Sequence, residues 1–153
     1  MTGTAAVPTS SIGPVTDAPV RTNNRLDAKR VLVYSDDAST RRQIIAALGD
    51  FPPDGLDPFL YVEVATGPGV IREMDAGSID LAILDGEAAP AGGMGIARQL
   101  KDEIEACPPI ILLTGRAEDR WLASWSQAEA VVSRPLDPFA LTKAAVTVLR
   151  SRS

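Results

Sequence analysis

The sequence predicts an α/β fold in which five parallel strands form one doubly wound sheet with five helices on its faces. The first observation is that short apolar runs alternate along the chain with segments whose apolar residues recur at helical spacing. The second is the run that ends at Asp85, which is apolar enough for a strand covered on both faces. The third is that several runs stop at an acidic or hydroxyl residue. Strands and helices that alternate in this way form such a sheet through right-handed crossovers.

Each predicted strand is an apolar or alternating run that ends at turn residues or at the start of a helical pattern. The first run stops at an acidic pair, the second follows a proline-rich loop, and the third is the central strand. The fourth begins at a proline and ends on a hydroxyl residue, and the fifth is short. In chain order, the predicted strands cover residues 30–35, 59–65, 79–85, 109–114 and 130–133.

Each predicted helix carries apolar residues on one face. The first covers residues 38–48 and stops at Gly49, and the second is a short helix marked by Val70 and Met74. The third and fourth cover residues 96–106 and 117–127. The last is capped by Asp137, has Pro138 at its first position and runs to about residue 150.

The composition is that of one globular domain with a tail. The chain has 153 residues, of which 45% are hydrophobic and 23% are charged. Residues 1–28 contain Pro8, Pro14 and Pro19 among small and polar residues and show no apolar periodicity. We therefore predict a flexible N-terminal tail that serves as a docking arm, followed by a folded domain over residues 29–150.

Composition also disfavours several classes of function. The net charge is −5 with no Lys/Arg-rich run, so nucleic-acid binding is not expected. Histidine is absent, which excludes His-dependent catalytic triads and imidazole zinc sites, and the single cysteine, Cys107, is expected to be buried and inert. No apolar run approaches the roughly 20 residues of a membrane span, and the N-terminus lacks a secretion signal, so a cytoplasmic protein is expected.

Residues that can carry chemistry stand at the carboxyl ends of the predicted strands: Asp36 and Asp37 after the first, Asp85 at the third, Thr114 at the fourth and Arg134 after the fifth. Parallel strands end at one edge of their sheet, so these side chains are expected to converge. Carboxylates crowded together need a cation, and oxygen ligation suits Mg²⁺. A metal, a carboxylate, a hydroxyl and a positive charge together indicate uptake of a phosphoryl group.

Four motifs resemble those of the receiver domains of bacterial two-component response regulators: SDDASTRR at residues 35–42, DLAILD at 80–85, LLTG at 112–115 and RPLD at 134–137. The resemblance covers residues 30–150 and implies a flavodoxin-like sheet of strand order 2-1-3-4-5. It implies that Asp85 is the phosphoacceptor and Thr114 the switch hydroxyl. It also implies that Asp36 and Asp37 position Mg²⁺, together with Asp85 and the backbone carbonyl of Glu87.

Three departures from the family pattern bear on the switch. Arg134 stands where the family has lysine, and its planar guanidinium differs in shape from an ammonium. Val131 stands where the family usually has an aromatic switch residue, and the loop after Asp85 is longer than usual. The bond from Arg134 to Pro135 is expected to be cis, as in the family.

Two simpler interpretations of the acidic site stay open. Asp36 and Asp37 can serve as a helix-capping pair, because acidic residues are favourable at helix starts. Arg134 can be a permanent counter-ion of Asp85 that locks the site instead of switching it.

Trp121 and Trp125 are one helical turn apart in the predicted fourth helix and so share a face. The resemblance places them on the surface through which the family docks its partners, and exposed tryptophan is a frequent interface anchor. We therefore expect both to bind a protein partner.

The leading hypothesis for function is a stand-alone receiver, phosphorylated on Asp85 by a histidine kinase, whose output is protein–protein contact. The alternative is a receiver-fold accessory subunit bound constitutively to a multi-subunit assembly, without a phosphorylation switch. An aspartate-nucleophile phosphatase with Glu87 as its second acid is a distant third, so enzyme activity is not expected.

Overall fold

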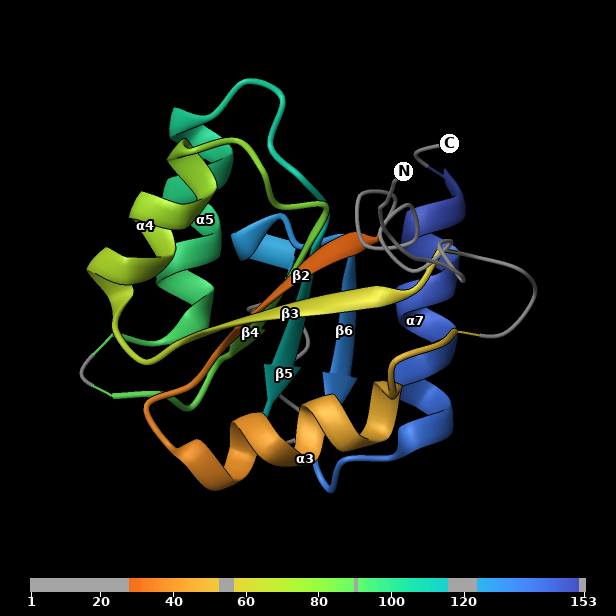
Figure 1. The fold of residues 1–153 in the computed structure, drawn as a ribbon. Helices are drawn as coiled ribbons and strands as arrows, with labels where there is room; N and C mark the ends of the chain where they lie inside the picture. The colour runs from red at the N-terminus through yellow and green to blue at the C-terminus, as the bar shows by residue number, and fades with distance from the viewer. Residues whose placement is uncertain (1–27, 53–56, 90, 116–123, 152–153) are drawn as a thin grey trace, which may run out of the picture.

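The computed structural model describes residues 28–52, 57–89, 91–115 and 124–151 (Figure 1). A five-stranded parallel sheet forms their centre, and its spatial order is β3-β2-β4-β5-β6. This is the second, first, third, fourth and fifth strand in chain order, so the predicted fold class and strand order are confirmed. The strands are β2 (Lys29–Tyr34), β3 (Phe59–Val64), β4 (Leu81–Asp85), β5 (Ile110–Thr114) and β6 (Ala130–Ser133).

Helices cover both faces of the sheet (Figure 1). α3 (Ala38–Leu48) and α7 (Pro138–Ser151) pack together on one face, and α4 (Gly67–Asp75) and α5 (Gly93–Glu103) pack on the other. Residues 124–126 are also helical, whereas the rest of the predicted helix over 117–127 lies outside the described residues. The predicted tail, residues 1–28, lies outside them as well, except for Ala28.

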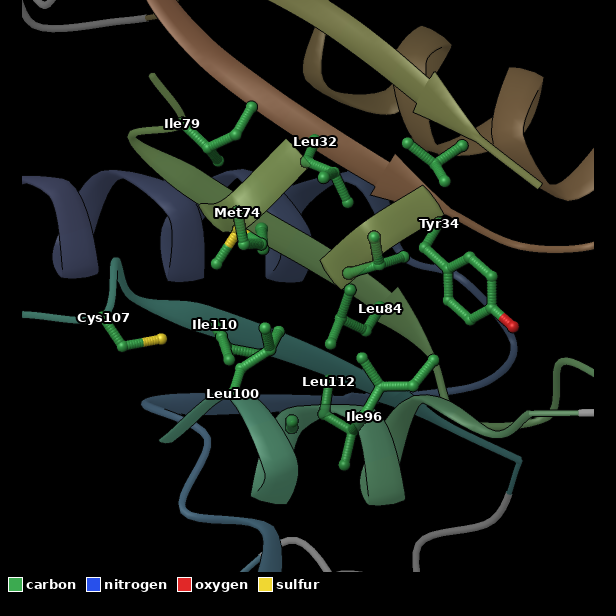
Figure 2. Close-up of a cluster of buried hydrophobic side chains, with 14 of the residues drawn as sticks. Leu32, Tyr34, Met74, Ile79, Leu84, Ile96, Leu100, Cys107, Ile110 and Leu112 are labelled. Atoms are coloured by element: carbon green, nitrogen blue, oxygen red, sulfur yellow. The ribbon is translucent and has the colours of Figure 1, made fainter. Parts of the chain in front are cut away.

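Successive side chains of each strand point to opposite faces of the sheet, so the buried residues form two clusters, one on each face. Figure 2 shows one of them, in which Leu32, Leu84 and Leu112 of the central strands meet α4 and α5. Cys107 lies in this cluster and is buried, as predicted. The opposite cluster packs the other strand faces against α3 and α7, including Leu141. Both faces of β4 are therefore covered, and all five of its residues are buried.

Two helices begin earlier than their apolar patterns indicate. α4 begins at Gly67 because Thr66 accepts a hydrogen bond from the Gly69 amide and Pro68 occupies the first turn. α5 begins at Gly93, before the first large apolar residue on its buried face. Glycine and proline in these first turns carry no apolar signal, so periodicity alone places the starts too late.

The strand register sets the edge of the sheet at which the candidate site lies. Asp85 pairs with Leu113 across β4 and β5, and Thr114 pairs with Ser133 across β5 and β6. The carboxyl ends of β4, β5 and β6 are therefore level with one another. Within the described ranges, no helix is long and apolar enough to cross a membrane.

Candidate functional site at the carboxyl edge of the sheet

Asp85, the last residue of β4, is the centre of the site. It is 3% exposed, and its carboxylate is hydrogen-bonded on both oxygens. Oδ2 accepts from the hydroxyl of Ser35 at 2.8 Å. Oδ1 accepts from the amide of Glu87 at 2.9 Å and from Nη2 of Arg134 at 2.9 Å. A buried carboxylate needs such partners, because an isolated buried charge is very costly.

Arg134 reaches Asp85 from the end of β6. Its backbone amide donates to the carbonyl of Thr114 at 2.9 Å, and its bond to Pro135 is cis, as the resemblance implied. Nη2 pairs with Asp85, whereas Nε is buried without a hydrogen-bond partner in the described part of the chain. The planar guanidinium thus meets the carboxylate through one arm while its Nε–H lacks a hydrogen-bond partner among the described residues, a geometry that a compact lysine ammonium cannot reproduce.

The two acidic residues after β2 have different contacts. Asp37 caps α3, because its carboxylate accepts from the amide of Ser39 at 2.9 Å and from the hydroxyl of Thr40 at 3.3 Å. Asp36 is exposed and accepts from the amide of Ala89 at 3.2 Å, in the loop that follows β4. The capping interpretation therefore holds for Asp37, while Asp36 ties the β4–α5 loop to the end of β2.

The predicted metal ligands do not form a ready-made cluster. Among the described residues, no group of three or more acidic or cysteine side chains is arranged to hold a metal ion. The physical reason lies in their contacts, since Asp37 turns onto the first turn of α3 and Asp85 faces Arg134. The donor types still suit Mg²⁺, which prefers carboxylate and carbonyl oxygens and keeps several waters. Magnesium binding by Asp36, Asp37, Asp85 and the Glu87 carbonyl stays a prediction.

Thr114, the predicted switch hydroxyl, is completely buried at the end of β5. Its hydroxyl donates to the hydroxyl of Ser133 on β6 at 3.1 Å. Val131, at the position where the family usually has an aromatic residue, is partly buried and packs against the core cluster of Figure 2. The hydroxyl is therefore held by a neighbouring strand, and its role in switching stays a prediction.

Three site residues were missed from the sequence: Ser35, Ser133 and Tyr34. Ser35 is fully buried; besides its bond to Asp85, its hydroxyl accepts from the amide of Asp37 at 3.1 Å. Tyr34 is fully buried and donates from Oη to the carbonyl of Ala91 at 2.5 Å, which places it beside the β4–α5 loop (Figure 2). Burial raises its pKa, and the nearby carboxylates of Asp36 and Asp85 raise it further. The sequence signal that could have identified these residues is their position, since each is a polar side chain at the end of an apolar run.

The chain leaves Asp85 through a narrow space between backbones. The amide of Gly86 donates to the carbonyl of Leu113 at 2.8 Å, and a Cβ at Gly86 would lie 2.6 Å from that oxygen. A Cβ at Gly93 would lie 2.9 Å from the carbonyl oxygen of Asp85. Glycine at both positions lets the loop pass close to β5 and return into α5.

Trp125 is the described member of the predicted partner-binding pair, and Trp121 lies outside the described residues. The side chain of Trp125 is half exposed, and the guanidinium carbon of Arg98 lies 5.2 Å from the centre of its ring. Arg98 also donates to the backbone carbonyl of Trp125 at 2.9 Å and pairs with Asp102. α5 thus holds the turn that presents Trp125, while its role in partner binding stays a prediction.

The fold and the acidic edge define a receiver-type domain, and comparisons with known proteins agree. No protein-family model matches the chain. It is 60% identical over 124 residues to uncharacterised response regulatory proteins from two strains of Mycobacterium tuberculosis, covering 81% of this chain and 93% of each relative. The chain therefore belongs to the response regulator family.

Solved receiver structures share the fold. The response regulator receiver domain protein of Clostridium thermocellum matches with a TM-score of 0.67 and 22% identity, covering 81% of this chain and 96% of that one. The response regulator TrrA of Thermotoga maritima, solved in complex with Mg²⁺-BeF, matches with a TM-score of 0.66 and 25% identity, covering 79% and 99%. The chemotaxis response regulator of Vibrio cholerae matches with a TM-score of 0.67 and 20% identity, covering 80% and 99%.

Proposed function

We propose that the chain is a cytoplasmic receiver that acts through protein–protein contact, is phosphorylated on Asp85 by a histidine kinase, and is restrained in that reaction by Arg134. The observation that carries the proposal is the arrangement of the Asp85 carboxylate at the carboxyl edge of the sheet. Oδ1 accepts two hydrogen bonds, whereas Oδ2 accepts one from the described residues. A carboxylate oxygen can accept two, so Oδ2 keeps a lone pair that can attack phosphorus.

In the proposed reaction, a carboxylate oxygen of Asp85 forms a bond to the phosphorus of the donor. The bond between phosphorus and the donor breaks, and its electron pair leaves with the donor group. Asp36, Asp37, Asp85 and the Glu87 carbonyl would hold Mg²⁺, which supplies neutralisation of the phosphoryl charge. The complex of the Thermotoga maritima relative with Mg²⁺-BeF supports this assignment.

Arg134 is proposed to slow the reaction. Its guanidinium neutralises Asp85 in the resting state, which makes the carboxylate a weaker nucleophile. For the incoming phosphoryl group to reach the site, Arg134 has to give up this bond and then contact the phosphoryl oxygens instead. Thr114 has to give up Ser133 in the same way to reach them.

The direct test is incubation with a small-molecule phosphodonor and magnesium, followed by intact mass measurement. We expect slow labelling that disappears in Asp85→Asn. Asp80→Asn is the matched control, because Asp80 lies just before β4 at the opposite end, where it accepts from the amide of Arg30 at 2.8 Å. Labelling of Asp85→Asn at the wild-type rate would show that the acceptor is a different residue.

Magnesium binding is tested separately by NMR titration of the backbone amides. We expect saturable shifts in the β4–α5 loop, because magnesium ligation by Asp36 competes with its hydrogen bond to Ala89. Asp85→Asn should weaken them. Equal shifts in magnesium chloride and in sodium chloride of matched ionic strength would contradict the magnesium assignment.

A second candidate function is a constitutive accessory subunit of a larger protein assembly. The resting ion pair between Asp85 and Arg134 favours it, since it satisfies the carboxylate without phosphorylation. Affinity purification from the native cell separates the two functions. Partners retained by Asp85→Asn but lost on deletion of residues 1–28 or in Trp125→Ala would favour the accessory subunit, and partners that depend on Asp85 would favour the switch.

A further inference from the structure

Ser35 places a hydroxyl donor on the carboxylate at which the proposed phosphorylation occurs. Its hydroxyl lies 2.8 Å from Oδ2 of Asp85, and both residues are buried. The hydroxyl is itself fixed, because its oxygen accepts from the amide of Asp37 at 3.1 Å. Its hydrogen is therefore directed at Asp85.

The backbone of Ser35 fixes the position of this hydroxyl. Its amide donates to the carbonyl of Val64 at 3.3 Å, and its carbonyl accepts from Nη1 of Arg41 at 2.7 Å. Arg41 is held in turn by an ion pair with Glu63 at 3.0 Å. Ser35 is thus anchored between β3 and α3, and the donor is preorganised toward Asp85.

A hydrogen bond to a charged acceptor is stronger than one to a neutral acceptor. The two carboxylate oxygens of Asp85 share a negative charge before phosphorylation. Afterwards they are the carbonyl and bridging oxygens of the acyl phosphate, which carry less charge, because the negative charge then lies on the phosphoryl oxygens. Ser35 therefore stabilises the free carboxylate more than the phosphorylated form. This difference opposes formation of the acyl phosphate and favours its loss.

We propose that Ser35 is a residue of the phosphorylation site that shortens the lifetime of phosphorylated Asp85 and slows its formation. The inference rests on the proposed function, because it concerns the same acyl phosphate. In the hydrolytic step, the oxygen of a water molecule bonds to phosphorus as the bond from phosphorus to the Asp85 oxygen breaks. The electron pair of that bond returns to the carboxylate, where Ser35 stabilises the developing charge, and inorganic phosphate leaves with a proton passing to solvent.

The test compares wild type with Ser35→Ala, Ser35→Cys and Ser39→Ala. Each protein is labelled with a small-molecule phosphodonor and magnesium under reducing conditions, freed of donor, and followed by intact mass. We expect Ser35→Ala to label faster and to lose phosphate more slowly, each by roughly threefold to tenfold. Ser35→Cys, a weaker donor of similar size, should fall between it and wild type. Ser39→Ala, which removes an exposed hydroxyl at the start of α3, should match wild type.

The opposite directions of the two rates separate this role from a structural one. Damage to the fold would slow labelling and lower the melting temperature, and if Ser35→Ala does not fold, Ser35→Cys decides the question. Suppose that wild type is labelled and that the folded Ser35 variants lose their phosphate with the same half-life as wild type. That result would overturn the inference and leave the proposed function standing. Absence of label in all four proteins would instead overturn the proposed function, and the inference with it.

Discussion

The guanidinium of Arg134 and the carboxylate of Asp85 form an ion pair of 2.9 Å that joins the end of β6 to the end of β4. The acidic partner is buried, whereas about a third of the basic side chain is exposed. The arginine therefore supplies, within the chain itself, a positive charge next to the proposed phosphoacceptor.

The first prediction concerns the stability of this pair. Arg134→Gln should lower the free energy of unfolding by about 1–3 kcal/mol, because it leaves a buried carboxylate without its counter-charge. Denaturant unfolding measures the change, with Arg42→Gln, an exposed arginine of α3, as the control. Adding Asp85→Asn should recover much of the loss. Equal stability of the two arginine variants would show that the pair contributes little.

The second prediction concerns the close passage after β4. Gly86→Ala should lower the free energy of unfolding by about 1–3 kcal/mol, because the new Cβ would lie 2.6 Å from the carbonyl oxygen of Leu113. Gly95→Ala is the matched control, since a Cβ there meets nothing within 4 Å and alanine favours the helix. We expect Gly95→Ala to stabilise the protein slightly. A loss at Gly95 as large as that at Gly86 would contradict the steric explanation.

The third prediction concerns alkaline pH. Burial, helped by the charge of Asp50, raises the pKa of Tyr61 above its ordinary value of 10.0, and its hydroxyl donates to the carbonyl of Gly49. The folded state therefore keeps a proton that the unfolded chain releases, so stability is complete below about pH 10 and falls as the pH rises further. Denaturant unfolding at about pH 8 and pH 11 should show a smaller alkaline loss for Tyr61→Phe. An unchanged loss would contradict the assignment.

The fourth prediction concerns the exposed aromatic residues. Trp125→Ala should weaken capture of the native partner with little change in melting temperature, since half of its surface is already exposed. Phe139→Ala, at the start of α7, removes an aromatic that is 85% exposed and should leave capture unchanged. Pull-down from native lysate with both variants measures the difference. If both variants retain the partner equally, Trp125 is not part of the docking surface.

The sheet could be predicted from the sequence because its strands are short apolar runs that end at polar residues. The alternation of apolar runs with segments of helical periodicity predicted the order of strands and helices along the chain. The family resemblance supplied the order of the strands within the sheet. Helix starts were less certain, because a cap such as Thr66 acts through one hydrogen bond and leaves no periodic signal. The starts of α4 at Gly67 and of α5 at Gly93 are examples, since both precede the first large apolar residue of the helix that is buried.

The site was predicted in its positions but not in its contacts. Asp85, Thr114 and Arg134 lie at the ends of adjacent strands, as expected. The hydroxyl contacts of Ser35 and Ser133 could not be found, because they depend on the register between strands and on side-chain direction. The sequence allowed Asp37 either to cap α3 or to position Mg²⁺. The hydrogen bond from the Ser39 amide to its carboxylate is what favours capping.

The restraint by Arg134 is tested most directly by the labelling rate of Arg134→Lys with a small-molecule phosphodonor and magnesium. A lysine ammonium is compact and mobile, so it can leave Asp85 and follow the phosphoryl group more readily than the planar guanidinium. We predict that Arg134→Lys labels roughly tenfold faster than wild type, and that label disappears from both when Asp85→Asn is added. Wild type that labels as fast as Arg134→Lys would contradict the proposal that the Arg134–Asp85 pair restrains phosphorylation.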